Sequence, residues 1–296
     1  MSGYARPDSV VDSQWVTDHL GDPSIRCVEV IWGDSAEWGT TAYANGHIPG
    51  AVAWEFAIDL HDLAHQDIVG KDGLEVLLAR CGVTPDTPIV LYSGLSNLLA
   101  TFAFWLLKVY GHSDVRLLDG DRQKWLAEGR PLSYETPRFA PALYHARPPD
   151  TRLRAGWEDV LRCLGQTGHV LVDARSAEMY AGGDTAGAAR GGHIPTAVNL
   201  AAYRETHSDG SFKAWRVPTV RADGTFLGAA DLRSVVEPLG ITPDQAIITY
   251  CVRGGLSTHT WFVLTQLLGY PNVREYDRSW VEWGNRLELP VDGARG

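Results

Sequence analysis

One cysteine in this sequence stands in a pattern suited to nucleophilic chemistry. The stretch reads Cys251-Val-Arg-Gly-Gly-Leu-Ser257, after an apolar, β-branched run over 246–250 and before apolar residues spaced as on a helix over 261–268. This order predicts a buried strand, a tight loop and a helix. A thiol at such a junction faces backbone N–H groups and the positive end of the helix dipole. Both lower the pKa of the thiol, and the same N–H groups can hold an anion attached to the sulfur.

The glycine pair after the cysteine supports this interpretation. Gly254 and Gly255 let the loop turn its amides inward without a steric penalty from Cβ. The alternative is a buried, inert cysteine on a strand, which is the commoner fate of a cysteine. Buried strands seldom end in Cys-x-x-Gly-Gly, so we interpret Cys251 as a reactive residue.

Length and composition limit what the protein can be. The chain has 296 residues, enough for two domains, and its composition is that of a soluble globular protein. A formal net charge of −10 argues against nucleic acid or an acidic membrane surface as a partner. We find no apolar run long enough to span a membrane and no apolar signal core at the start. We therefore expect a cytoplasmic protein.

The four cysteines form neither a zinc motif nor a disulfide framework. They are Cys27, Cys81, Cys163 and Cys251, and no two of them make a CxxC pair. A reducing compartment leaves Cys251 free to react. We expect no metal site.

The sequence also contains an internal repeat. Three segments recur 158 positions apart: Gly-Val-Thr-Pro-Asp86 as Gly-Ile-Thr-Pro-Asp244, Ile89-Val-Leu-Tyr-Ser93 as Ile247-Ile-Thr-Tyr-Cys251, and Tyr110–Val115 as Leu268–Val273. The Gly-His-Ile-Pro turn at Gly46 recurs at Gly192, 146 positions on, so a 12-residue insertion falls between His193 and Pro243. Matches in the same order indicate a duplicated domain.

Each half of the repeat shows the same alternation of helix and strand. The predicted elements are, in the first half, a helix near Trp15–Leu20, a strand at Arg26–Trp32, a helix at Leu74–Cys81 and a last strand at Val115–Asp119, and, in the second, Trp157–Leu164, His169–Asp173, Ala229–Leu239 and Val273–Asp277. This alternation predicts an α/β fold with two tandem domains, each a mostly parallel sheet flanked by helices. We place the domains at 1–130 and 151–296, joined by a proline-rich, semi-rigid linker at 131–150.

Several of these motifs together resemble the tandem-domain rhodaneses, a family of sulfurtransferases. They are Gly-His-Ile-Pro in both halves, Val172-Asp-Ala-Arg-Ser176, the Cys251 loop and Tyr276-Asp-Arg-Ser-Trp-Val-Glu-Trp-Gly284. The last is similar to the end of the thiosulfate-type enzymes, and the match runs from about Val11 to Asn285. The resemblance implies two rhodanese-like domains, of which only the second is catalytic, with an active site near the domain interface.

The repeat itself supports this asymmetry. Ser93 stands where Cys251 stands in the second half, in the loop Ser93-Gly-Leu-Ser-Asn97. A serine without a neighbouring base is a poor nucleophile at neutral pH. We therefore expect the first domain to be a structural partner.

A sulfurtransferase needs a thiolate that takes up a sulfane sulfur, and groups that stabilise the negative charge. Cys251 supplies the nucleophile, and the predicted substrate-binding loop is Val252, Arg253, Gly254, Gly255, Leu256 and Ser257. Arg253 favours thiosulfate as the donor, because the resemblance links basic loops to thiosulfate and small neutral loops to mercaptopyruvate. The predicted function is sulfur transfer from thiosulfate to a thiophilic acceptor, cyanide or a thiol, with a thiol protein as a possible acceptor. No cofactor is required.

Further site residues come from the resemblance. Arg175 is expected in the site wall, with a structural ion pair to Asp173 as the alternative. Met179 stands near the position where many members carry a second substrate-binding Arg, and Arg190 or Arg204 can replace it. Asp59, with His61 and His65 near it, is a candidate at the domain interface. We interpret three other histidines as structural: His47, His193 and His259.

Three other functions stay open. A 3-mercaptopyruvate sulfurtransferase is the nearest. A phosphatase of the same fold needs Arg six residues after the cysteine to clamp phosphate, and Ser257 stands there. A non-catalytic sulfur-carrier or protein-binding module is the third, with Val252 and Met179 as its signs.

Overall fold

The computed structural model describes residues 3–33, 40–206, 208–209 and 212–293, which fold into two compact units. One consists of Asp8–Asp150 with Ala222–Thr225, and the other of Met1–Pro7, Thr151–Arg221 and Phe226–Gly296. We call them the first and the second unit. In the described parts of the chain, no helix is both long and apolar enough to cross a membrane.

The first unit is built on a five-stranded parallel sheet in the order β1-β7-β6-β2-β3. Its strands are β1 (Val10–Val11), β2 (Arg26–Ile31), β3 (Val52–Glu55), β6 (Ile89–Tyr92) and β7 (Val115–Leu118). A short antiparallel pair, β4 (His61–Asp62) and β5 (Asp67–Ile68), lies outside the sheet. The central strand β6 is buried at every position, as its continuous apolar sequence predicts.

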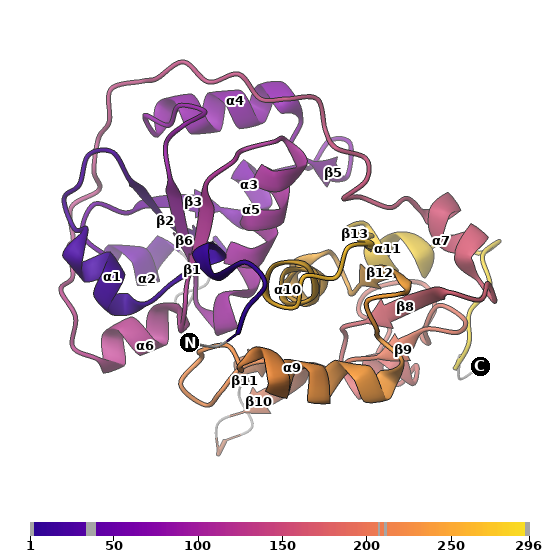
Figure 1. The fold of residues 1–296 in the computed structure, drawn as a ribbon. Helices are drawn as coiled ribbons and strands as arrows, with labels where there is room; N and C mark the ends of the chain where they lie inside the picture. Colours follow the sequence, from indigo (N-terminus) through magenta and orange to yellow (C-terminus); the bar gives the residue numbers. More distant parts are fainter. Residues whose placement is uncertain (1–2, 34–39, 207, 210–211, 294–296) are drawn as a thin grey trace. The chain divides into compact units, whose positions relative to one another are not determined.

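Helices cover both faces of this sheet. They are α1 (Ser13–Asp18), α2 (Thr40–Ala44), α3 (Phe56–Asp59), α4 (Lys71–Arg80), α5 (Leu98–Val109) and α6 (Asp121–Ala127). Figure 1 shows α1 and α6 on one side of the strands and α5 on the other. Apolar side chains buried along nearly the whole of α5 explain why this helix follows the central strand as a core element.

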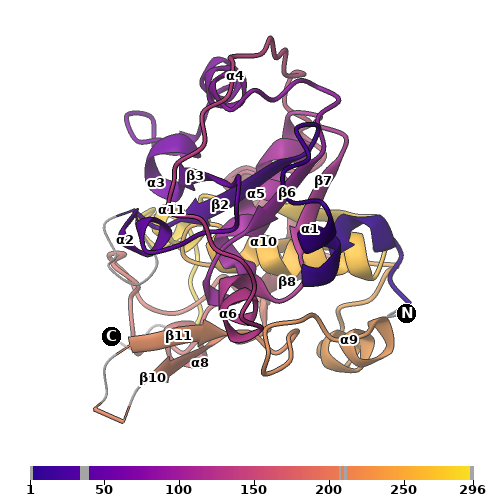
Figure 2. The same cartoon turned by 90° about the vertical axis from the view of Figure 1, so that its left-hand side faces the viewer.

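The second unit repeats this plan with a four-stranded parallel sheet in the order β13-β12-β8-β9. Its strands are β8 (His169–Asp173), β9 (Val198–Asn199), β12 (Ala246–Tyr250) and β13 (Val273–Glu275). Its helices are α7 (Trp157–Cys163), α8 (Ala177–Tyr180), α9 (Ala229–Val236), α10 (Gly255–Phe262) and α11 (Ser279–Trp283). An antiparallel hairpin, β10 (Tyr203–Thr206) and β11 (Phe212–Arg216), lies between His193 and Pro243, where the repeat locates the insertion (Figure 2). Two parallel sheets flanked by helices confirm the predicted α/β fold class.

The Gly-His-Ile-Pro turns have the same structure in both units. His47 stacks on Tyr43 with ring centroids 3.8 Å apart, and His193 stacks on Tyr180 at 3.7 Å. In each case Nδ1 of the histidine lies 2.9 Å from the carbonyl oxygen of that tyrosine. Because the turn is equally built in the half with Ser93, these contacts favour the structural role predicted for both histidines.

The segment 131–150 belongs to the first unit. Its backbone N–H groups at Ala142 and Arg147 donate to the carbonyl oxygens of Ala79 and Tyr110, both at 3.0 Å. Tyr144 is buried and its hydroxyl lies 2.9 Å from Nδ1 of His112. The predicted linker segment therefore packs on the surface of the first unit.

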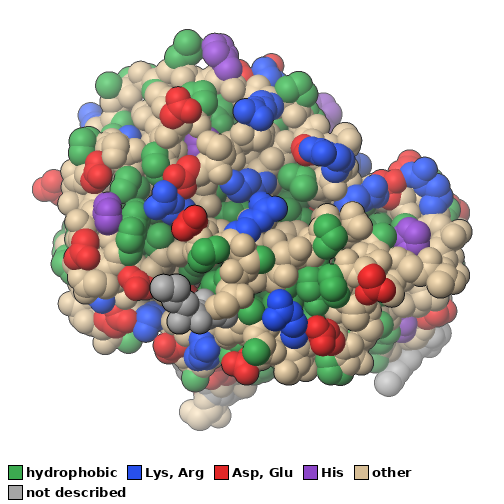
Figure 3. Space-filling model, in the orientation of Figure 1, with side chains coloured by type: hydrophobic (Ala, Val, Ile, Leu, Met, Phe, Trp, Pro, Cys, Tyr) green, Lys and Arg blue, Asp and Glu red, His purple; other side chains and the backbone are tan. Residues whose placement is uncertain are grey.

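Charged side chains of both signs share the molecular surface. On the face shown in Figure 3, Lys and Arg side chains are interspersed with Asp and Glu. Because the formal net charge is −10, positive potential at the surface comes from individual basic side chains and not from the protein as a whole. Arg253 in the cysteine loop is one such exposed side chain.

Candidate active site

Cys251 stands directly after β12, at the carboxyl end of the parallel sheet of the second unit. Three residues, Val252, Arg253 and Gly254, then lead into α10, whose first residue is Gly255. Ligands of open parallel sheets bind at this edge, where loops connect strand ends to helix N-termini. The predicted strand, loop and helix are therefore present, and the thiol faces the first turn of α10.

The two glycines of the loop have different reasons to be glycine. Gly254 has φ of 85°, in the left-handed region that an L side chain adopts only with strain. Gly255 has no positive φ, and a Cβ added there would meet nothing within 4 Å. The inward turn of the loop thus depends on the backbone conformation of Gly254, whereas Gly255 has space for a side chain.

The end of β13 and the start of α11 hold the cysteine loop in place. The backbone N–H of Cys251 donates to Ser279 Oγ at 3.0 Å, and the Ser279 hydroxyl donates to the Tyr276 carbonyl oxygen at 2.7 Å. The N–H of Trp280 donates to the carbonyl oxygen of Cys251 at 3.1 Å, and that of Val281 to Val252 at 3.2 Å. The Tyr-Asp-Arg-Ser-Trp motif is therefore a support for the nucleophile loop.

The thiol of Cys251 is buried, with 2% of the residue exposed. Burial raises the pKa of this thiol, and a negative charge on Glu275 raises it further. Hydrogen bonds from the Ser257 hydroxyl and from the backbone N–H groups of Ser257 and Arg253 lower it, but by less. The sequence predicts a lowered pKa from the loop amides; these amides are present, yet desolvation outweighs them.

The other loop residues differ in exposure. Arg253 is exposed, and within the described residues its guanidinium forms no ion pair. Val252 and Leu256 are half-buried, whereas Ser257 is fully buried. Arg253 is thus the loop cation that a dissolved anion can reach.

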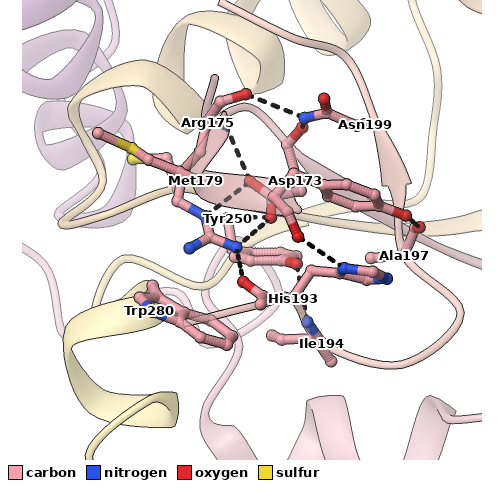
Figure 4. Close-up of polar contacts among 12 residues, drawn as sticks. Asp173, Arg175, Met179, His193, Ile194, Ala197, Asn199, Tyr250 and Trp280 are labelled. Atoms are coloured by element: carbon pink, nitrogen blue, oxygen red, sulfur yellow. Dashed lines mark hydrogen bonds and ion pairs between the residues drawn. The ribbon is translucent and has the colours of Figure 1, made fainter. Parts of the chain in front are cut away.

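Arg175 lies in an internal ion pair. It is fully buried, and its guanidinium bonds both carboxylate oxygens of Asp173, with Nη2 also 2.8 Å from the carbonyl oxygen of Gly192 (Figure 4). The guanidinium carbon lies 4.2 Å from the centre of the Trp280 ring. These contacts favour the structural ion pair over a place in the site wall.

Arg190 is engaged in a different way. Its guanidinium donates to the carbonyl oxygens of Trp283, Gly284, Arg286 and Leu289, so it holds the turns after α11. Met179, in α8, is half-buried, and Arg204 is an exposed residue of β10. Arg190 therefore does not replace the second substrate-binding Arg, because its guanidinium donates to backbone carbonyl oxygens.

Asp59 of the first unit is bound within its own unit. Its carboxylate accepts from Arg80 Nη2 at 2.6 Å and from the backbone N–H of Glu55 at 2.8 Å. His61 Nδ1 lies 2.7 Å from the Phe56 carbonyl oxygen, and His65 pairs with Asp62. The interface role of Asp59 stays a prediction.

His259 and two residues missed in the sequence complete the surroundings of the loop. His259 is buried in α10, with Nε2 2.8 Å from Thr219 Oγ1, and these contacts favour the structural role predicted for it. Ser279 and Glu275 both contact the loop, and neither residue is predicted from the sequence as part of the site. The available signal for Glu275 was the repeat, because the matching residue of the first half is Leu117.

Comparisons with known proteins agree with the architecture. The family model for the rhodanese-like domain matches residues 12–128 and 157–286. The chain is 40% identical over 299 residues to the sulfur carrier protein TtuD of Thermus thermophilus, covering 98% of each. It is 37% identical over 298 residues to the thiosulfate sulfurtransferase of Corynebacterium glutamicum, covering 98% of this chain and 92% of that one. These matches confirm the resemblance seen in the motifs.

Solved structures share the fold at lower identity. The anaerobic ergothioneine biosynthesis enzyme of Chlorobium limicola superposes with a TM-score of 0.83 at 22% identity, over 97% of this chain and 71% of that one. YnjE superposes with a TM-score of 0.77 at 24% identity, over 96% and 68%. At these identities the likeness concerns the fold alone.

Proposed function

Since the chain belongs to the rhodanese-like domain family of sulfurtransferases, we propose that it moves a sulfane sulfur from thiosulfate to a thiophilic acceptor through a persulfide on Cys251. Cyanide or a thiol serves as the acceptor, and a thiol on a protein is one form of it. The second unit carries the reaction, because the matching residue of the first unit is Ser93.

One observation carries this proposal: Cys251 follows β12 directly, before the N-terminus of α10, where the backbone N–H groups of Ser257 and Arg253 lower the pKa of its thiol. An added outer sulfur carries a negative charge, and amides together with the helix dipole stabilise an anion there. The exposed guanidinium of Arg253 stands in the same loop and can stabilise the sulfonate of the donor.

The reaction consists of two displacements at sulfur. The Cys251 thiolate attacks the outer sulfur of thiosulfate, the sulfur–sulfur bond of the donor breaks, and sulfite leaves with the bonding electron pair. Cys251 then holds the persulfide. The acceptor attacks its outer sulfur, the Cys251–sulfur bond breaks, and the thiolate returns. Electrons balance in both steps, and neither step needs a redox cofactor.

Steady-state assays with thiosulfate and with 3-mercaptopyruvate, each with cyanide as acceptor, test the proposal. We expect turnover with thiosulfate by the wild-type protein and its loss in Cys251→Ser. Turnover by mercaptopyruvate alone would replace this function by that of a mercaptopyruvate sulfurtransferase.

A second candidate is a sulfur carrier that takes up sulfur and passes it to a protein partner. Its support is the similarity to a relative named as a sulfur carrier protein, together with the internal engagement of Arg175 and Arg190. Arg175 and Arg190 bind groups within the protein, so Arg253 is the one of these three arginines that supports turnover of thiosulfate. A stable persulfide on Cys251 with slow transfer to cyanide would identify the carrier.

A further inference from the structure

A fully buried carboxyl group lies beside the nucleophile and has no part in the steps above. Glu275, the last residue of β13, is 0% exposed. Its Oε1 contacts Ser257 Oγ and its Oε2 contacts Thr249 Oγ1 at hydrogen-bond distance. We call these three residues, Thr249, Ser257 and Glu275, the buried polar triad. The Ser257 hydroxyl also lowers the pKa of the Cys251 thiol, so the triad acts on the reacting atom through Ser257.

The internal repeat shows that the fold does not need this triad. At the matching positions, 158 residues earlier, the first unit carries three buried leucines: Leu91, Leu99 and Leu117. The strand register is the same, since Thr249 pairs with Glu275 as Leu91 pairs with Leu117. Apolar side chains there avoid the cost of burying polar groups. The polar set occurs in the unit with the cysteine and is absent from the unit with Ser93, which points to the chemistry of the cysteine.

The surroundings of Glu275 favour its neutral form. Within the described residues no Lys or Arg forms an ion pair with it. Burial raises its pKa well above the ordinary carboxyl value, the nearby Asp277 adds to this, and the hydroxyls of Ser257 and Thr249 only partly oppose it. Asp277 is itself paired with Arg154, and His259 of α10 is bonded to Thr219. Burial without a cation partner therefore favours the protonated acid over the carboxylate.

A neutral acid changes the direction of the hydrogen bonds. Ser257 has one proton to donate, and two oxygen acceptors contact it: Glu275 Oε1 and the Gly254 carbonyl oxygen at 3.3 Å. The Cys251 thiol, whose pKa the Ser257 hydroxyl lowers, is the third group that competes for this proton. An ionised Glu275 would take this proton and would place a second negative charge beside the thiolate. A protonated Glu275 can donate to Ser257 Oγ instead, while Thr249 donates to the other carboxyl oxygen. The Ser257 proton then points to the sulfur.

We propose that Glu275 is a positioning residue: as a neutral acid it donates a hydrogen bond to Ser257 Oγ and so directs the Ser257 hydroxyl to the thiolate or persulfide of Cys251. This role deepens the proposed function and rests on it for its biological meaning. The hydrogen-bond chain itself concerns the thiol and is testable without any sulfur donor.

The test measures the pH midpoint of Cys251 labelling by iodoacetamide, a neutral reagent. Labelling is read by mass spectrometry on the tryptic peptide 234–253, which holds no other cysteine. In Glu275→Gln the amide N–H₂ replaces the acid proton as donor to Ser257, so we expect a midpoint within about 0.3 units of wild type. Glu275→Leu and Ser257→Ala lose the directed donor, and both should raise the midpoint by about one unit.

Two variants serve as controls. Glu288→Gln removes an exposed carboxylate of the same unit, whose side chain is 63% exposed, and should leave the midpoint in place. The triple variant Thr249→Leu, Ser257→Leu and Glu275→Leu copies the first unit and should fold at least as stably as wild type. A folded triple variant with a raised midpoint shows that the shift comes from loss of the proton donor and not from unfolding. If Glu275→Leu fails to fold, the midpoint of Glu275→Gln still tests the proposal.

Three outcomes would overturn the proposal. A midpoint lowered by about one unit in Glu275→Gln would mean that Glu275 is an anion in the wild type. An unchanged midpoint in Ser257→Ala, or in a folded Glu275→Leu, would mean that no directed donor exists. A wild-type thiol that stays unlabelled at all pH values up to about 10 would contradict a reachable thiolate. If the midpoints behave as expected but thiosulfate leaves no sulfur on Cys251, the proposed function fails and the role of Glu275 stands.

Discussion

Asp121 Oδ2 accepts a hydrogen bond from the backbone N–H of Ser96 at 2.9 Å, so the loop of the first unit already holds a carboxylate of its own. The matching residues of the second unit are Ser279 and Gly254. There a neutral hydroxyl holds the loop through the N–H of Cys251. The two loops follow matching strands, but an internal anion accepts from an amide in the first unit. The matching amide of the second unit has no carboxylate partner among the described residues.

Ser93→Cys should therefore not create a second active site. Asp121 and Asn97 occupy the amides of this loop, since Asn97 Oδ1 accepts from the N–H of Ser93 at 2.8 Å, and no basic side chain stands in 93–97. We expect slow labelling of the new thiol by iodoacetamide at neutral pH and no gain in sulfur transfer over a Cys251→Ser background. Rapid labelling together with restored transfer would contradict this.

Arg253→Ala should lower kcat/KM for thiosulfate more than for mercaptopyruvate. The exposed guanidinium stabilises a sulfonate and the departing sulfite, and one charge-assisted hydrogen bond accounts for a loss of about ten- to 150-fold. Mercaptopyruvate has a planar carboxylate and a less charged leaving group, so it depends less on this cation. Equal losses on both donors, measured in parallel steady-state assays, would show that Arg253 does not choose the donor.

Gly254→Ala and Gly255→Ala should behave differently although the residues are neighbours. Gly254 has a positive φ, so an alanine there should cost about 1–2 kcal/mol of unfolding free energy and disturb the loop amides. Gly255 has space for a Cβ and opens a helix, so its alanine variant should be neutral or slightly stabilised. Urea unfolding of both variants checks this pair, and similar losses at both positions would show that φ is not the cause.

The stability of the protein should depend on pH through Glu275. Its pKa is raised in the folded state, so folding favours the protonated acid. That contribution is complete below the ordinary carboxyl pKa and is lost as the pH rises through the raised value. Glu275→Gln has no such proton. The free energy of unfolding of this variant, relative to that of the wild type, should therefore increase between about pH 4.5 and about pH 8, because the wild type loses stability as Glu275 ionises. If the difference in unfolding free energy between Glu275→Gln and wild type does not change with pH, the pKa of Glu275 is not raised by folding.

The sequence was sufficient for most of the fold because the signals are local and repeated. The strand at His169–Asp173 is observed as predicted, since a continuous apolar run marks a buried parallel strand. The helix predicted from Leu74 begins at Lys71, because the first turn is polar and apolar spacing cannot reveal it. Trp32, predicted as strand, lies beyond β2 and is 54% exposed, so its apolar character alone misled the prediction.

The candidate site was less predictable because its properties depend on burial. The position of Cys251 follows from the repeat, but the direction of its pKa shift does not, since desolvation by packed neighbours outweighs the loop amides. From the sequence, Arg175 could bind either a substrate or Asp173; in the structure its guanidinium forms a buried ion pair with Asp173. Glu275 and Ser257 lie 18 residues apart on different elements, and only the register of β13 beside β12 brings the carboxyl group to the loop.

The most direct test of the proposed sulfur transfer is the mass of the 234–253 peptide after incubation with thiosulfate and removal of the donor. We predict that this peptide gains the mass of one sulfur atom, that a thiol reductant removes it, that cyanide removes it with formation of thiocyanate, and that Cys251→Ser never acquires it. Absence of the added sulfur from wild-type Cys251, or turnover of thiosulfate by Cys251→Ser, would contradict the account.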